Sequence, residues 1–174
     1  MYRLTYVIVF KGYTAGSHRL HPGSGSNYLC MPEDPQWENY VSGSQGVGTV
    51  VGVAYGFSSR TSVFSENNTD TDLGGQPGPC AFCYVGGRST VAMIPARTQC
   101  PDGWTTEYAG YLMSEWSNSD RKRSSFICWD EAPEIASGGI APQAAIYPVE
   151  VLCGSLPCSQ YITDRELSCV VCSK

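Results

Sequence analysis

The sequence has little charge and almost no histidine. Only 16% of its 174 residues are charged, and His18 and His21 are its two histidines. The formal net charge is −5, and this lack of a basic excess argues against nucleic acid as the main partner. No apolar run reaches the ~18 residues that a membrane-spanning helix requires, so we expect no membrane insertion.

Catalytic motifs are missing as well. The sequence contains neither a Gly-x-Ser-x-Gly nucleophile motif nor a His-Glu-x-x-His zinc motif. It also lacks a Gly-X-Y repeat and a low-complexity tail. We therefore expect a non-enzymatic protein that carries no cofactor and no metal.

Turn-forming and strand-forming residues are abundant. The chain has 19 glycines, 11 prolines and 11 tyrosines, and 42% of its residues are hydrophobic. No segment keeps a 3.6-residue apolar period, so the sequence predicts an all-β fold. The run from Met1 to Phe10 is too short for a signal peptide and is interpreted as a first strand. The expected strands are Tyr6–Phe10, Tyr28–Met31, Thr49–Phe57, Thr90–Ile94, Ser125–Trp129, Ala145–Leu152 and Leu167–Cys172.

The second half of the chain is similar to the first. A shift of 98 residues, the spacing between Cys30 and Cys128, also places Gly12-Tyr13 on Gly110-Tyr111. Six of the 25 positions from 11 to 35 are then identical without a gap. With a gap, the first Cys-x-x-Cys pair falls on the second. This internal similarity predicts a tandem duplication, with pseudo-repeats at 1–88 and 89–174 that form one compact unit.

The nine cysteines allow two interpretations, disulfides in a secreted protein or metal binding in an intracellular one. Two Cys-x-x-Cys pairs are a ligand set for structural zinc, but Cys83 and Cys169 lie 86 residues apart, wider than in zinc ribbons. The glycosylation sequon at Asn67 fits export. We therefore favour disulfides, and the odd number leaves at least one thiol free or bonded outside the chain.

Sequence logic alone leaves the cysteine pairing open, because six cysteines in the second half allow fifteen pairings. Cysteines three residues apart on a strand point to opposite faces, so Cys169 and Cys172 should have different partners. A nested arrangement then suggests itself, with Cys83 unpaired because Tyr2 stands where its partner is expected. Its bridges are Cys30–Cys80, Cys100–Cys172, Cys128–Cys169 and the local pair Cys153–Cys158.

The stretch from Pro79 to Tyr111 reads PCAFC, then an apolar strand, then IPARTQCPDGWTTEYAGY. It closely resembles the linker between the two halves of the C-terminal non-collagenous domain of type IV collagen. The ending LSCVVC is similar to the end of that domain, and the domains of sponge-type and other invertebrate short-chain collagens are more similar still. This likeness also involves Gly12-Tyr13, Asn27–Pro35, Met93–Arg97, Gly110–Met113, Cys153–Cys158 and Arg165–Leu167.

The resemblance implies a duplicated β fold, nested disulfides, an extracellular setting, assembly into oligomers and no catalysis. The chain departs from the family in lacking a triple-helical repeat and a cysteine at position 2. Its first half also has no pair that corresponds to Cys153–Cys158. Because the triple helix is missing, we expect that the module has been reused for recognition.

Two loops at corresponding positions, 14–27 and 112–124, are candidate carbohydrate sites. Sugar sites combine a flat aromatic ring with planar polar groups, and these loops contain both. The alternatives are that they are solvated turns, or that Trp116 is an oligomer contact. The basic run 121–123 is a solvated loop or a site for a sulfated or sialylated glycan. The candidate ligand-binding residues are Ser17, His18, His21, Asn27, Trp116, Asn118 and Arg121.

Two hypotheses for function follow. The first is a secreted, oligomeric lectin in which several weak glycan sites act together. The alternative is an extracellular-matrix assembly domain of a short-chain collagen-like protein. The expected partners are glycans or matrix proteins, together with further copies of the chain. A large apolar patch favours assembly, whereas shallow aromatic and polar sites repeated in both halves favour a lectin.

Overall fold

The computed structural model describes residues 6–21, 27–39, 41–44, 49–58, 63–64, 72–116, 125–139 and 143–174. Within these ranges the chain forms nine strands and no helix, which confirms the predicted all-β class. The described residues accordingly contain no long apolar helix that could cross a membrane.

The first half of the chain contains four strands, and the second half contains five. The first four are β1 (Tyr6–Gly16), β2 (Leu29–Pro32), β3 (Val51–Tyr55) and β4 (Pro79–Val85). The others are β5 (Val91–Pro95), β6 (Thr105–Ser114), β7 (Ile127–Asp130), β8 (Ala144–Pro148) and β9 (Ser168–Ser173).

All seven predicted strands overlap observed ones, but β4 and β6 were not predicted and β1 extends to Gly16. Neither missed strand shows the apolar alternation that identifies a strand with one buried face. In β4 the apolar side chains Phe82 and Tyr84 are exposed, and in β6 the residues from Leu112 to Ser114 are buried on both faces.

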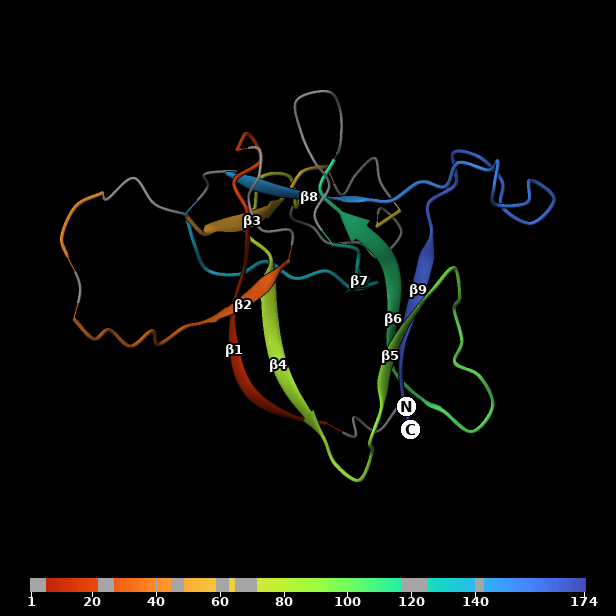
Figure 1. Ribbon diagram of the computed structural model, residues 1–174, viewed down its shortest axis with the longest axis horizontal. Coiled ribbons are helices and arrows are strands. Elements are labelled where there is room, and N and C mark those ends of the chain that lie inside the picture. The colour runs from red at the N-terminus through yellow and green to blue at the C-terminus, as the bar shows by residue number, and fades with distance from the viewer. Residues whose placement is uncertain are drawn as a thin grey trace.

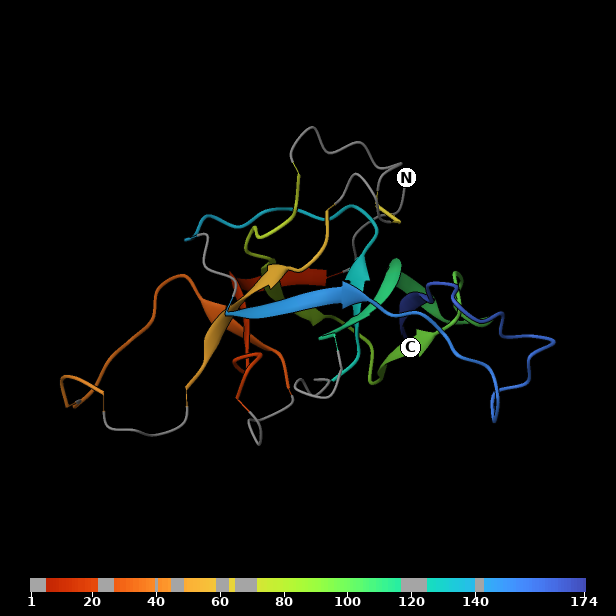
Figure 2. The same ribbon diagram turned by 90° about the horizontal axis from the view of Figure 1, so that it is seen from above.

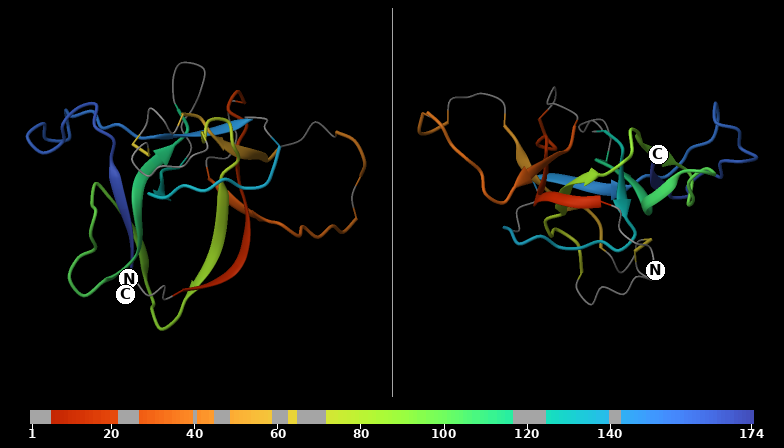
Figure 3. Two further views of the ribbon diagram at one scale, coloured as in Figure 1. Left: turned by 180° about the vertical axis from the view of Figure 1, so that it is seen from behind. Right: turned by 90° about the horizontal axis from the view of Figure 1, so that it is seen from below.

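The strands form one sheet in the order β2-β1-β3-β8-β6-β9-β5, with β4 beside β1 and β7 beside β6. Figure 1 shows two long arms, one made of β1 and β4 and the other of β5, β6 and β9. The parallel pair β3–β8 joins them, with Val53 opposite Ala144. Figure 2 shows β8 running across the top of both arms, and the arms stay apart in the rear view of Figure 3.

The two arms have the same strand register. Gly12 lies opposite Pro32, and Gly110 lies opposite Asp130, so both partners differ by the 98 positions seen in the sequence. A Cβ atom on Gly12 would lie 1.9 Å from the carbonyl oxygen of Met31. A Cβ atom on Gly110 would lie 1.8 Å from the carbonyl oxygen of Trp129, which is 98 positions after Met31. Each arm therefore needs glycine where its neighbouring strand crosses closely.

The register on the other side of β1 and β6 also recurs. Gly12 lies opposite Cys80 in the first arm, and Gly110 lies opposite Cys169 in the second. One extra residue interrupts each pairing, at Val9 in β1 and at Glu107 in β6. These two residues are also 98 positions apart, so both strands bulge at the same point.

The main hydrophobic core lies between the arms, around β3 and β8. It takes side chains from both halves of the chain: Val53, Tyr55, Phe64, Leu73, Met113, Trp129, Ala144 and Ile146. A smaller cluster of Leu112, Cys128, Val149 and Cys169 belongs to the second half alone. Where that cluster has Leu112, the first half has the polar Thr14, whose hydroxyl donates to the Pro79 carbonyl oxygen at 3.0 Å.

Four disulfides hold these strands together, and they join the pairs that the sequence analysis suggested. They are Cys30–Cys80, Cys100–Cys172, Cys128–Cys169 and Cys153–Cys158, and Cys83 is the free cysteine. Because Cys80, Cys169 and Cys172 are all bridged, the alternative interpretation of the two Cys-x-x-Cys pairs as zinc ligands is wrong.

Candidate functional site

The two candidate loops meet the same strand, β8. The backbone N–H of Arg19 donates to the carbonyl oxygen of Gln143 at 3.0 Å. The backbone N–H of Ala145 donates to Oε2 of Glu115 at 3.1 Å. Gln143 and Ala145 are two residues apart, so their backbone groups lie on the same edge of the strand. The first loop and the residues after β6 are therefore neighbours along this edge.

An aromatic pair lies further along β8. Trp116 is 51% exposed, and its ring centroid is 6.4 Å from that of Tyr147 with the planes at 58°. The Tyr147 ring covers Gly56 so closely that a Cβ there would lie 2.1 Å from Cζ of the ring. Glycine at this position thus lets the aromatic pair pack against the β3 end of the sheet.

The first loop turns tightly at its two histidines. The rings of His18 and His21 stack with centroids 4.1 Å apart, and Nδ1 of His18 accepts a hydrogen bond from the Leu20 N–H at 3.2 Å. Desolvation lowers the pKa of His18, as do the neighbouring His21 and Arg19. Because Nδ1 is an acceptor, the neutral ring carries its proton on Nε2, which leaves that nitrogen without a lone pair for a metal. The described residues contain no cluster of three or more His, Cys, Asp or Glu suited to a metal ion.

Five of the seven predicted ligand-binding residues lie in the part of the chain that the structure describes. Ser17 and His18 are half-buried, whereas His21, Asn27 and Trp116 are exposed. Asn118 and Arg121 lie outside the described residues, as does the sequon residue Asn67.

Parts of both predicted loops are in fact strand. Residues 14–16 belong to β1, and residues 112–114 belong to β6. Glu115, expected in a solvated loop, is only 8% exposed because its carboxylate binds the β8 backbone. The sequence analysis also missed Gln143 and Tyr147, since only the pairing of β8 brings them here and no local pattern encodes that pairing.

A second surface of interest is the free end of the β1–β4 arm. The apolar side chains of Val7, Ile8, Val9, Phe82 and Tyr84 are 44–66% exposed there. The rings of Phe10 and Phe82 stack across the two strands, with centroids 5.4 Å apart. Trp37, on the chain between β2 and β3, is 77% exposed and is therefore not a core residue.

The free thiol lies on this arm too. Cys83 is opposite Ile8 on β1 and is half-buried. Burial raises the pKa of Cys83, and the nearby Glu107 carboxylate raises it further. The pKa of Tyr108 rises to about 12, mainly through burial, and its hydroxyl donates to the Cys128 carbonyl oxygen at 3.0 Å. The thiol therefore faces protonated and acidic groups and is a weak nucleophile at neutral pH.

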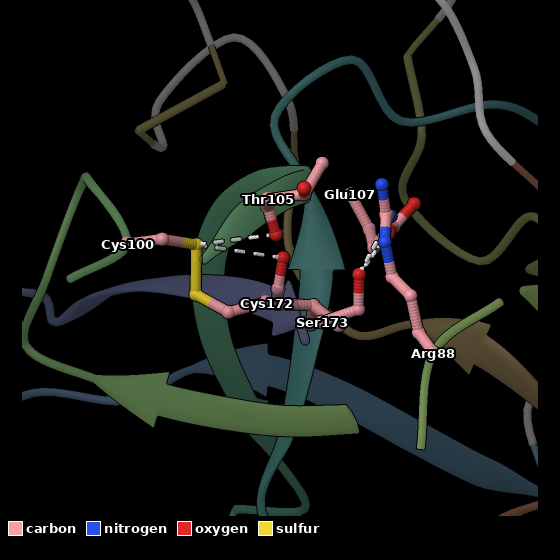
Figure 4. Close-up of a disulfide and its surroundings, with 7 residues drawn as sticks. Arg88, Cys100, Thr105, Glu107, Cys172 and Ser173 are labelled. Carbon is pink, nitrogen blue, oxygen red and sulfur yellow. Dashed lines mark hydrogen bonds and ion pairs between the residues drawn. A yellow bond between two sulfur atoms is a disulfide. The ribbon is translucent and has the colours of Figure 1, made fainter. Parts of the chain in front are cut away.

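The corresponding end of the second arm is closed. Figure 4 shows the Cys100–Cys172 disulfide beside the ion pair between Arg88 and Glu107, whose Nη1 and Oε1 atoms are 2.6 Å apart. Arg88 also donates to Oγ of Ser173 at 2.8 Å, and that hydroxyl donates to Glu107. The backbone of Thr90 and Lys174 exchanges two hydrogen bonds of 3.0 Å. These contacts hold the end of β9, at Ser173 and Lys174, against the turn before β5, at Arg88 and Thr90.

No family model and no solved structure matches the chain.

Proposed function

We propose that this chain is a secreted, extracellular assembly module that associates with further copies of itself through the free end of the β1–β4 arm. We further propose that it arose by tandem duplication and is related to the C-terminal non-collagenous domain of type IV collagen. The shared register of the two arms, with glycines and bulges 98 positions apart, supports the duplication.

The observation that carries the assembly proposal is the exposed apolar surface of β1 and β4. Five apolar side chains, from Val7 to Val9 and at Phe82 and Tyr84, are 44–66% exposed on one strand pair. Val7, Phe82 and Tyr84 share one face of the ribbon, because Val7 is opposite Tyr84 and side chains two residues apart on a strand point the same way. Ile8, opposite Cys83, lies on the other face. Exposed apolar side chains grouped on one face are typical of a protein–protein contact. An isolated two-stranded ribbon is also only marginally stable in water, so a covering partner would stabilise it.

The strand β4 itself favours pairing with another chain. Its residues from Cys80 to Val85 carry no charge and no proline, which are the features that discourage association at sheet edges. No described strand other than β1 pairs with β4. The sequence analysis expected an apolar patch to favour assembly over carbohydrate binding, and the exposed side chains of β1 and β4 support that choice, so we place assembly first.

The test is the molar mass of the protein in solution, measured by light scattering over a range of concentrations. We expect the natural chain to form a homo-oligomer, and the paired substitution Phe82→Lys and Tyr84→Lys to produce monomer. Each of these apolar side chains is worth about 1.5–3 kcal/mol when fully buried, so the two charges should remove most of the association free energy.

The matched control is Leu152→Lys, which places the same charge on an apolar residue that is 71% exposed outside the arm. The control should keep the oligomer. A natural chain that stays monomeric at high concentration, or an oligomer that survives both lysines, would refute this proposal.

A further inference from the structure

The outer face of β8 is a second surface with the features of a ligand site. Side chains alternate along a strand, and Ala144 and Ile146 point into the main core. Ala145 and Tyr147 therefore lie on the opposite face, where Ala145 is covered (1% exposed) and Tyr147 is half-buried. The accessible part of this face is thus its Tyr147 end. Trp116 contacts Tyr147 on that face, and the first loop is tied to the beginning of β8 through Arg19.

The aromatic part of this face is both exposed and well supported. Half of the Trp116 surface is open to solvent, and Tyr147 beside it rests on Gly56. Trp116 is thus a flat platform outside the core clusters. The C–H faces of sugar rings stack on such indole rings, while the polar edge of the ring and nearby side chains bind the hydroxyls.

The cation of this region is Arg19, whose backbone binds the chain at the beginning of β8. Its Nε atom is buried and donates to no acceptor, and the one ion pair within the described residues is that of Arg88 and Glu107. The carboxylate of Glu115 is 8% exposed and already binds the Ala145 N–H. Arg19 as a whole is half-buried, so a ligand that approaches from solvent meets the outer edge of its guanidinium and not the buried Nε. His18 precedes Arg19 in the sequence, and His21 follows two residues later.

The two residues are anchored at different points of β8. The backbone of Arg19 binds Gln143, and Trp116 lies against Tyr147, four residues further along the chain. Four residues of extended strand span about 13 Å. Because the anchoring points are separated, we expect a ligand that uses both side chains to be an oligosaccharide and not a single sugar.

We infer that the outer face of β8 binds an acidic oligosaccharide, with Trp116 stacking on a sugar ring and Arg19 pairing with its carboxylate or sulfate group. Guanidinium groups bind such planar or tetrahedral oxyanions through two parallel hydrogen bonds. This site is separate from the free end of the β1–β4 arm. The tests of carbohydrate binding and of assembly are therefore independent.

Calorimetric titration of the full chain tests the inference with three probes: a sulfated glycosaminoglycan oligosaccharide, a sialylated trisaccharide and its neutral counterpart without sialic acid. We expect at least one acidic probe to bind about tenfold or more tightly than the neutral one, because one charge-assisted contact contributes that much. The substitutions Arg19→Gln and Trp116→Ala should each weaken binding of the acidic probe by about tenfold.

Arg97→Gln and Trp37→Ala are the matched controls, since both residues are exposed and lie outside this face. Both controls should bind like the natural chain, and thermal unfolding should show that all four variants fold. Equal affinity for acidic and neutral probes, no binding of any probe, or unchanged binding by a folded Arg19→Gln variant would overturn the inference. The molar mass measured in parallel reports separately on assembly.

Discussion

The strand pairs β1–β4 and β6–β9 have the same register but different surroundings. In the second pair, β5 covers the outer edge of β9, and Cys172 is bonded to Cys100. In the first pair, no described strand covers the outer edge of β4, and Cys83, at the position of Cys172, is a free thiol. The extra residue in the bulge is Glu107 in one arm and the exposed Val9 in the other.

From this difference we propose that one strand arrangement serves two purposes. The closed arm has an ion pair, a disulfide and an added strand, and its β9 residues Val170 and Cys172 are completely buried. The open arm keeps the same pairing but leaves Phe82 and Tyr84 in solvent. The closed arm stabilises the fold, and we propose that the open arm supplies the contact between molecules.

The largest expected effect comes from removing the disulfide that closes the second arm. Cys100→Ser with Cys172→Ser should lower the free energy of unfolding by about 4 kcal/mol, because the bridge closes a loop with a sequence separation of 72. Removing Cys153–Cys158, with a separation of 5, should cost only about 2 kcal/mol. Urea unfolding measures both, and equal losses would show that the long bridge does not stabilise this arm.

The second-largest effect concerns the two bulge residues, Glu107 and Val9, whose surroundings should contribute differently to the free energy of unfolding. Arg88→Ala leaves the Glu107 carboxylate, which is 5% exposed, without its cation, and we expect a loss of about 3 kcal/mol. Adding Glu107→Gln should restore part of that stability, since the buried charge is then gone. Val9 takes the place of Glu107 in the open arm, and Val9→Ala should cost less than about 0.5 kcal/mol. Similar losses at Arg88 and Val9 in urea unfolding would contradict the contrast between the arms.

The free thiol should react slowly. The pKa of Cys83 is raised by burial and then by Glu107, so the thiol keeps its proton through neutral pH and ionises only above its ordinary pKa of 9. The alkylation rate, followed by mass spectrometry, should therefore still be rising with pH above 9. Glu107→Gln should increase the rate at pH 8, and Glu150→Gln, which does not act on this pKa, should not. Fast alkylation at pH 7 would contradict this account.

The smallest effect concerns the first loop. Desolvation, His21 and Arg19 lower the pKa of His18 below its ordinary 6.5, so the ring stays neutral as the pH falls through 6.5. Its contribution to stability is present above that pH and is lost as the pH falls further. Arg19→Gln should move the His18 pKa upward in an NMR titration. A His18 pKa above 6.5 in the natural chain would show that the turn does not favour the neutral ring.

The sequence predicted those parts of the fold that local patterns encode. The short apolar strands such as Val91–Pro95 were found because they alternate or lie between turn residues. The shift that aligns Cys30 with Cys128 also aligns the pairing of β1 with β2 and of β6 with β7. Strands β4 and β6 were missed because their burial depends on neighbours that are distant in sequence.

The candidate carbohydrate site was predictable only in part. Trp116 and His18 were predicted as candidates because aromatic and imidazole side chains in polar loops are recognisable in a sequence. The hydrogen bond of Glu115 to β8 depends on the antiparallel pairing of β6 with β8, in which the preceding residue, Ser114, lies opposite Tyr147. That long-range pairing has no local signal, so Tyr147 could be assigned to the site only from the structure.

Hydrogen exchange of the two corresponding strands tests the central claim most directly. The amides of β4 (79–85) and β9 (168–173) should be followed by mass spectrometry at low and at high protein concentration. We expect exchange in β4 to slow as the concentration rises, because another copy covers it, while β9 is protected equally at both concentrations by β5. Exchange in β4 that is the same at both concentrations would show that the open arm does not mediate assembly.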